Sequence, residues 1–367
     1  MLTLLAVVLL VYLFQCMGWA SARAHVFRLD DPQRGRWKKD GFLWGALQLR
    51  GYWANPLPPL QPLTVVDWPA FQLTPEAVHI GSVSSSGPGE PVSWDQAFFS
   101  RVEGKLLCNG VKVFEGGADQ CNAYLEMLSR LQQAKVKDRK KLIEVWLRKA
   151  TDAEAAQERL ESFSHKAIWL ELAANLQFCV LFTTTPLAFY RFSGKALWPT
   201  LAAVLTISIF ISWQFWRLHR KFFPADGEAR FKSLFSILLS PINAIRAADS
   251  LARDLLAGFH PVAAAQVVCR RVEFEAFAGE QLRAIKFSHS GDGWYADQVQ
   301  HSLEALLEKA GLEPTRLLQA PQREDNCVSY CPRCLAQYTK TREDCSDCGF
   351  GPLQAFPEEQ GIATGSD

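Results

Sequence analysis

Three long apolar runs interrupt an otherwise mixed pattern of hydrophobic and polar positions along the chain. Residues Ala196 to Trp216 pass 21 positions without a charged side chain, and Leu172 to Tyr190 pass 19. At 1.5 Å per residue, each run is long enough to cross the roughly 30 Å hydrocarbon core of a bilayer. Since only Arg191 to Lys195 separate the two runs, the pattern predicts a transmembrane helical hairpin over residues 166–217.

The first apolar run, Leu2 to Met17, has two interpretations. We favour an uncleaved transmembrane anchor over residues 1–20, because basic residues follow closely and positive charge stays on the cytoplasmic side. These residues are Arg23, Arg28, Arg34, Arg36, Lys38 and Lys39. A signal peptide is the alternative, since Ala20-Ser21-Ala22 fits a small-residue cleavage pattern. Three spans then predict a multi-pass protein of the cell (inner) membrane whose soluble regions are cytoplasmic.

Residues 23–164 are expected to form a mixed α/β soluble region. Two short apolar stretches between Lys105 and Phe114 flank Asn109-Gly110, the dipeptide best suited to a two-residue type I′ turn. A β-hairpin is predicted there. From Ala118 the apolar spacing becomes helical for two helices, and a capping box of Thr151 and Glu154 predicts the start of a third.

The charge of the whole chain is balanced, with 39 basic and 38 acidic residues, which excludes a general polyanion binder. Residues 130–149 are an exception, with eight basic against two acidic side chains, a net charge of 8 − 2 = +6. Attraction to anionic headgroups of membrane lipids is one interpretation, and a solvated helix face is the other. No nucleic-acid partner is expected, because no aromatic-rich binding strand accompanies the charge.

Residues 218–320 are predicted to combine amphipathic helices with a small α+β region. Ser240 followed by Pro241 is typical of a helix start. Alternating apolar and charged residues predict strands over 272–277 and 282–287, and a helix closed by Gly311 follows.

Candidate chemistry is confined to one cysteine array near the C-terminus. Cys331, Cys334, Cys345 and Cys348 form the pattern C-x2-C-x10-C-x2-C. Two such pairs can place four thiolates tetrahedrally around one ion, and zinc is the metal expected for an all-sulfur structural site. Iron in an electron carrier is the alternative metal.

The segment around these cysteines resembles the zinc-ribbon modules found at the ends of many bacterial proteins. The resemblance covers residues 327–351, before a predicted flexible tail over 352–367. The matching residues are Tyr330, Cys331, Pro332, Cys334, Tyr338, Cys345, Asp347, Cys348 and Gly349. The resemblance implies a closed, structural zinc site. Four basic and eight acidic residues over 321–367 give 4 − 8 = −4, which favours a protein partner over nucleic acid.

Together these features predict a membrane protein with α-helical transmembrane segments, α+β soluble parts and a small C-terminal zinc ribbon. The sequence contains no HExxH, GxSxG, P-loop or dinucleotide-binding motif, and it identifies no small-molecule substrate. We therefore expect a non-enzymatic protein whose cytoplasmic ribbon is a structural or protein-docking module. A membrane redox protein that uses metal-bound or free thiols is the alternative.

Overall fold

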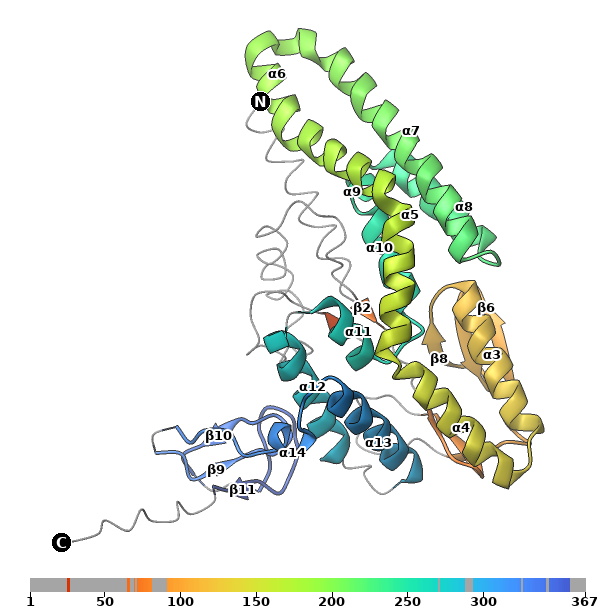
Figure 1. The fold of residues 1–367 in the computed structure, drawn as a ribbon, viewed down its shortest axis with the longest axis vertical. Helices are drawn as coiled ribbons and strands as arrows, with labels where there is room; N and C mark the ends of the chain where they lie inside the picture. The colour runs from red at the N-terminus through yellow and green to blue at the C-terminus, as the bar shows by residue number, and fades with distance from the viewer. Residues whose placement is uncertain are drawn as a thin grey trace, which may run out of the picture.

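The computed structural model describes residues 25–26, 65–66, 69, 71–80, 91–269, 271–287, 293–324, 326–340 and 343–356. A long helical arm lies at one end of the molecule and a small C-terminal sheet at the other, and the described residues form three further small sheets (Figure 1). The predicted N-terminal anchor over residues 1–20 lies outside the described residues.

The strands before the arm form small antiparallel sheets. They are β1 (His25–Val26) paired with β2 (Val65–Val66), then β3 (Phe71–Leu73), β4 (Ala77–Ile80) and β5 (Pro91–Ser93), then β6 (Phe99–Val102), β7 (Lys105–Cys108) and β8 (Val111–Glu115). The predicted hairpin is confirmed: β7 pairs with β8, and Asn109 and Gly110 have φ values of 48° and 80°. Positive φ at both positions is what the Asn-Gly turn supplies.

Two helices cover these sheets, α3 (Ala118–Gln133) and α4 (Val136–Ala150). Trp94 anchors their core, being 1% exposed and donating from its indole Nε1 to the Thr74 carbonyl at 2.9 Å. Gln132 of α3 donates to the carbonyls of both Trp94 and Ala97 at 3.0 Å. The buried indole and the backbone of Trp94 are therefore both held by hydrogen bonds, as buried polar groups require.

The arm consists of α5 (Ala153–Cys179), the π-helix η1 (Val180–Thr184), α6 (Thr185–Phe192), the 3-10 turn η2 (Ser193–Ala196) and α7 (Leu197–Phe222). Helix α5 starts at Asp152, whose Oδ1 accepts from the Ala155 N–H at 3.0 Å, one residue after the predicted cap Thr151. The chain reverses at η2, and α7 returns along α5 (Figure 1). Gln177 donates to Ser208 at 3.2 Å, and the rings of Phe163 and Phe222 lie 5.6 Å apart, which sets the register of the two helices.

The predicted multi-pass fold class is wrong. Within the described ranges, one helical segment, Ala153–Phe222, is long and apolar enough to cross a membrane, and most of the rest is α+β structure. The prediction counted each uncharged run as a separate span. In the structure both runs belong to this one segment, and its lower part packs into a protein core with α9 and α10 through Phe163, Ile211 and Phe215. Part of the uncharged sequence is therefore buried against other helices of the protein. The length of an uncharged run does not distinguish such a core helix from a membrane span.

The helices after the arm are α8 (Gly227–Leu239), α9 (Pro241–Ile245), α10 (Ala247–Leu256), α11 (Pro261–Val268), α12 (Arg271–Lys286), α13 (Trp294–Lys309) and α14 (Pro314–Leu317). The helix start at Ser240 and Pro241 is confirmed, since the Ser240 hydroxyl accepts from the Asn243 N–H at 3.4 Å. The two predicted strands at 272–277 and 282–287 are wrong, because both lie in or directly after α12. Gly311 follows α13 with a φ of 69°, as predicted for a helix end.

Candidate metal site

A three-stranded antiparallel sheet holds the four cysteines of the C-terminal array. Its strands are β9 (Ser329–Tyr330), β10 (Gln337–Tyr338) and β11 (Gln354–Ala355), in the order β10-β9-β11. The strand β11 falls inside the segment predicted as a flexible tail, so order extends beyond the predicted end of the ribbon at residue 351.

Both cysteine pairs form the same tight backbone turn. The Leu335 N–H donates to the Cys331 carbonyl, and the Gly349 N–H donates to the Cys345 carbonyl, each at 2.8 Å. Leu335 and Gly349, which follow the second cysteine of each pair, have φ values of 60° and 68°. The left-handed conformation costs leucine free energy, because its Cβ comes close to the following carbonyl oxygen. Both turns adopt this conformation, and in each the two cysteine sulfurs point toward the same side.

The four sulfurs converge on one point. Cys331 Sγ lies 3.6 Å from Cys348 Sγ, Cys334 Sγ lies 3.4 Å from Cys345 Sγ, and all four atoms lie within 4.8 Å of one another. Tetrahedral ligands at the usual zinc–sulfur distance of about 2.3 Å are separated by about 3.8 Å. The cysteines are therefore placed to bind one metal ion, and the donor set fits zinc without distinguishing it from iron.

The environment acts differently on the individual thiols. Burial raises the pKa of Cys345, but hydrogen bonds from the Tyr338 hydroxyl, at 3.1 Å, and from the backbone of Cys348 and Asp347 outweigh burial and lower it to about 7. A hydrogen bond to Cys331 and burial raise the pKa of Cys334. Since thiolates are the metal ligands, ion binding would release the protons that these thiols otherwise hold.

The ribbon contacts the helical body at Phe287, the residue that follows α12. The rings of Phe287 and Phe350 lie 6.0 Å apart in an edge-on arrangement. Arg283 donates to the Leu317 carbonyl at 2.7 Å, while its buried Nε has no hydrogen-bond partner. Burial lowers the pKa of Arg283, and the charges of Glu280 and Cys334 partly offset this effect. Arg283 thus brings a cation to the edge of the cysteine cluster, a role that no sequence motif signals.

The other described cysteines lie apart from this cluster. Cys108 and Cys121 are fully buried free thiols in the core between the sheet and α3, and burial raises the pKa of both. Both cysteines therefore pack as small core residues. Cys327 is 6% exposed and precedes the array by four positions, yet it is not among the converging sulfurs.

The basic stretch 130–149 has two parts in the structure. Arg139 is buried and donates to the carbonyls of Leu131, Pro75 and Gln132 at 2.8, 3.0 and 3.3 Å, with its guanidinium 5.3 Å from the Trp94 ring. Arg139 is therefore a structural clamp and is unavailable to lipid. The remaining members except Arg130, which pairs with Glu126, are exposed along α4: Lys135, Lys137, Lys140, Lys141, Arg148 and Lys149.

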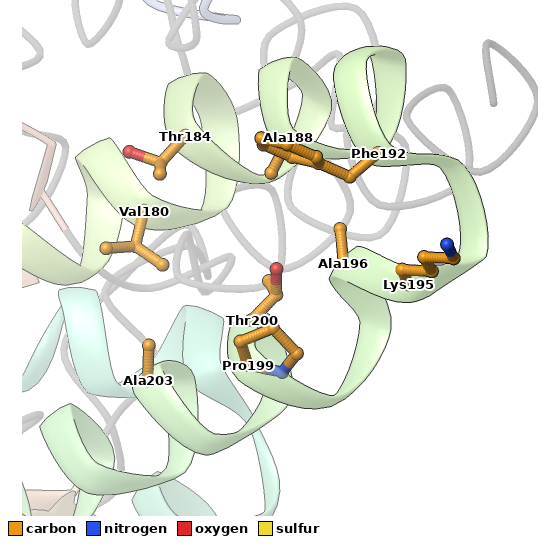
Figure 2. Close-up of a pocket in the computed structure, with 9 residues that line it drawn as sticks. All are labelled: Val180, Thr184, Ala188, Phe192, Lys195, Ala196, Pro199, Thr200 and Ala203. Carbon is orange, nitrogen blue, oxygen red and sulfur yellow. The ribbon is translucent and has the colours of Figure 1, made fainter.

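A cavity of about 420 Å³ lies at the tip of the arm, between the η1–α6 segment and the start of α7 (Figure 2). Val180 and Thr184 from the π-helix face Pro199 and Ala203 across it, and Lys195 lies at one end. Lys195 is the one ionisable side chain in this lining, so the cavity has no acid–base pair of the kind that catalysis uses.

Comparison of the chain with protein-family models, curated proteins and solved structures finds no match. The cysteine cluster and the arm therefore have to be interpreted from their own chemistry.

Proposed function

We propose that this chain is a non-enzymatic, membrane-associated protein whose cysteine ribbon binds one structural zinc ion and docks a protein partner. The observation that carries the proposal is the closed set of four converging sulfurs. Four thiolates complete a tetrahedral shell and leave no position for water or substrate, as in structural rather than catalytic zinc sites. Zinc then supplies much of the folding free energy of a segment with few buried apolar residues of its own.

The arm supports membrane association. Its exposed apolar residues follow both helices over many turns: Ile168, Trp169, Leu172, Leu176, Leu187, Phe192, Leu197, Trp198, Leu201, Leu205, Ile209, Phe210, Trp213 and Trp216. Soluble monomers rarely expose so large a continuous apolar surface. Lipid contact along the arm, at the cell (inner) membrane, accounts for this surface. A site of four cysteine ligands needs a compartment that keeps thiols reduced, which favours a cytoplasmic position for the remainder of the chain.

The docking role is supported by the charge of the ribbon region. Its net charge of 4 − 8 = −4 is made more negative by about 2 when four thiolates bind a divalent ion. An acidic surface of this kind repels phosphate backbones and favours a basic protein surface.

The test compares three full-length chains: the unaltered protein, Cys345→Ser, and Cys327→Ala as the matched control outside the cluster. Cells that express each chain are crosslinked before lysis, and their membranes are then washed with alkaline carbonate. The chain is recovered from the washed membranes and analysed for crosslinks and for metal. We expect all three in the washed membranes, one zinc ion in the unaltered and Cys327→Ala chains, and loss of specific crosslinks in Cys345→Ser alone. Crosslinks that survive Cys345→Ser would refute the docking role.

The metal analysis also decides between zinc and the redox alternative. Iron with a visible absorption band would favour the electron carrier and overturn the structural zinc site. A membrane-impermeant thiol reagent added to intact cells tests the orientation: Cys108, Cys121 and Cys327 should stay protected until lysis, and labelling before lysis would contradict a cytoplasmic position.

A further inference from the structure

The base of the arm carries a stripe of alternating tryptophan and arginine on one face of α7. Trp213, Trp216, Arg217 and Arg220 are spaced i, i+3, i+4 and i+7, which places them on the same helix face. Trp213 is 53% exposed and Trp216 is 40% exposed. The Arg217 guanidinium lies 5.8 Å from the Trp213 ring, and the Arg220 guanidinium lies 5.6 Å from the Trp216 ring.

The exposed surface of α7 is apolar further along the arm. Leu201, Leu205 and Ile209 precede Trp213 at intervals of four residues and are all exposed. From Leu201 to Arg217 the helix rises about 24 Å at 1.5 Å per residue. The exposed surface, which winds about 40° around the helix at each step of four residues, therefore changes from aliphatic to aromatic to cationic along the helix. Side chains follow this order from hydrocarbon through the headgroup layer into water.

Helix α5 also changes from aromatic to basic side chains beside the tryptophans of α7. Counting from the Gln177–Ser208 and Phe163–Phe222 contacts, the antiparallel register brings Trp169 level with Trp216. Trp169 is 59% exposed, and one turn before it the Lys166 ammonium lies 5.5 Å from the Phe222 ring. We call Lys166, Trp169, Trp213, Trp216, Arg217 and Arg220 the basic–aromatic collar.

The described carboxylates leave the cations of the collar without an ion pair. In the part of the chain that the structure describes, no carboxylate forms an ion pair with Lys166, Arg217 or Arg220. Each cation lies against an aromatic ring, and Lys166 also donates to the Ser162 hydroxyl at 2.5 Å. These neutral neighbours hold the cations in place without neutralising them. An anionic group is the complement that fits this surface.

We propose that the basic–aromatic collar binds the phosphate groups of anionic lipid headgroups. This inference rests on the proposed membrane association and names its recognition surface. The exposed bases of α4 are poorly placed for the same role. Between the end of α4 at Ala150 and Lys166, α5 rises about 20 Å, and Figure 1 shows α4 at the end of α5 remote from the tip. That offset exceeds the Debye length of about 8 Å at physiological salt.

The experiment uses the full chain in detergent micelles, incubated with equimolar phosphatidylglycerol and phosphatidylcholine and analysed by native mass spectrometry. We expect the unaltered chain to retain the anionic lipid over the neutral one by on the order of tenfold. R217Q/R220Q should bring the ratio close to one, and R217K/R220K should largely restore it. K137Q/K141Q, which removes the same charge from exposed positions of α4, should leave the ratio unchanged.

Equal retention of the two lipids by the unaltered chain would overturn the collar as a headgroup site. A preference that persists in R217Q/R220Q but disappears in K137Q/K141Q would also overturn it and would assign the site to α4. Failure of the proposed function has a different signature: the chain would retain neither lipid and would stay in solution when detergent is removed.

Discussion

Asp226, just after α7, joins the base of the arm to the start of α3. Replacement of Asp226 tests how strongly this contact holds the arm to α3. Its Oδ2 accepts from the Ala118 N–H at 3.0 Å, across 108 positions of sequence, and the residue is 7% exposed. A second contact runs the opposite way, since Asp119 Oδ1 accepts from the Ala225 N–H at 3.3 Å. The carboxylate of Asp226 thus satisfies the start of α3 in place of a local cap, which Gly117 cannot supply.

Asp226→Ala should destabilise this junction by about 2 kcal/mol. Loss of a capping oxygen costs about 1 kcal/mol, and loss of a partly buried negative charge at a helix N-terminus costs about 1 kcal/mol more. Asp226→Asn keeps an oxygen acceptor and should lose about half as much. A residue at position 117 larger than glycine should act similarly, because a Cβ there would lie 2.8 Å from Asp226 Oδ2.

Hydrogen exchange of the first turn of α3 provides the assay. A change of 2 kcal/mol corresponds to roughly 30-fold faster exchange where local opening controls the rate. Asp152→Ala is the matched control, because Asp152 caps α5 locally and should accelerate exchange there without affecting α3. Unchanged exchange at Ala118 in Asp226→Ala, or equal effects of Asp226→Ala and Asp226→Asn, would refute the reasoning.

Three further predictions follow from the described contacts. Burial lowers the pKa of His260 to about 3, so below about pH 6.5 the unfolded chain binds a proton that the folded chain does not. His260 should therefore contribute a loss of about 1.4 kcal/mol of stability per pH unit as the pH falls below that value, and the stability of His260→Asn should fall less steeply; acid melts of equal slope would contradict this. Chelation of the metal should open residues 326–356 to trypsin while the helical body stays protected, and digestion patterns indifferent to chelator would contradict a structural site. Arg283→Met should speed release of zinc to a chromogenic chelator, because it removes the cation near Cys334, whereas the exposed Lys286→Met on the same helix should not; equal rates for both variants would exclude this role.

Local signals predicted local structure well. The Asn109-Gly110 turn is set by two adjacent residues whose positive φ the sequence favours, so the hairpin could be identified without its surroundings. The cysteine cluster could also be predicted from the sequence, because the spacing within each pair determines where its sulfurs can point. In both cases the chemistry lies within a few residues.

The strands predicted within α12 failed because one sequence satisfied two periodicities. Apolar and charged residues alternate near its start, as in a half-buried strand, yet Phe274, Ala278 and Leu282 recur every four positions and are the residues buried. Packing against α11 and α13 selected the helical pattern. Short windows cannot make that choice, because the deciding contacts are distant in sequence.

Long-range contacts also explain what the sequence did not indicate about Arg139 and about the arm. Arg139 belongs to a basic run in the sequence, but carbonyls from Pro75 and the end of α3 enclose it. The two uncharged runs gave no sign that Ile211 and Phe215 would pack against α9 and α10. Charge and hydropathy report what a side chain is, whereas burial depends on which element reaches it.

X-ray absorption at the metal edge of the purified full-length chain tests the central claim most directly. The account predicts one zinc ion per chain with four sulfur neighbours at about 2.3 Å, supplied by the array from Cys331 to Cys348. A shell with oxygen or nitrogen ligands, an iron edge, or the absence of a stoichiometric metal would contradict a closed structural zinc site.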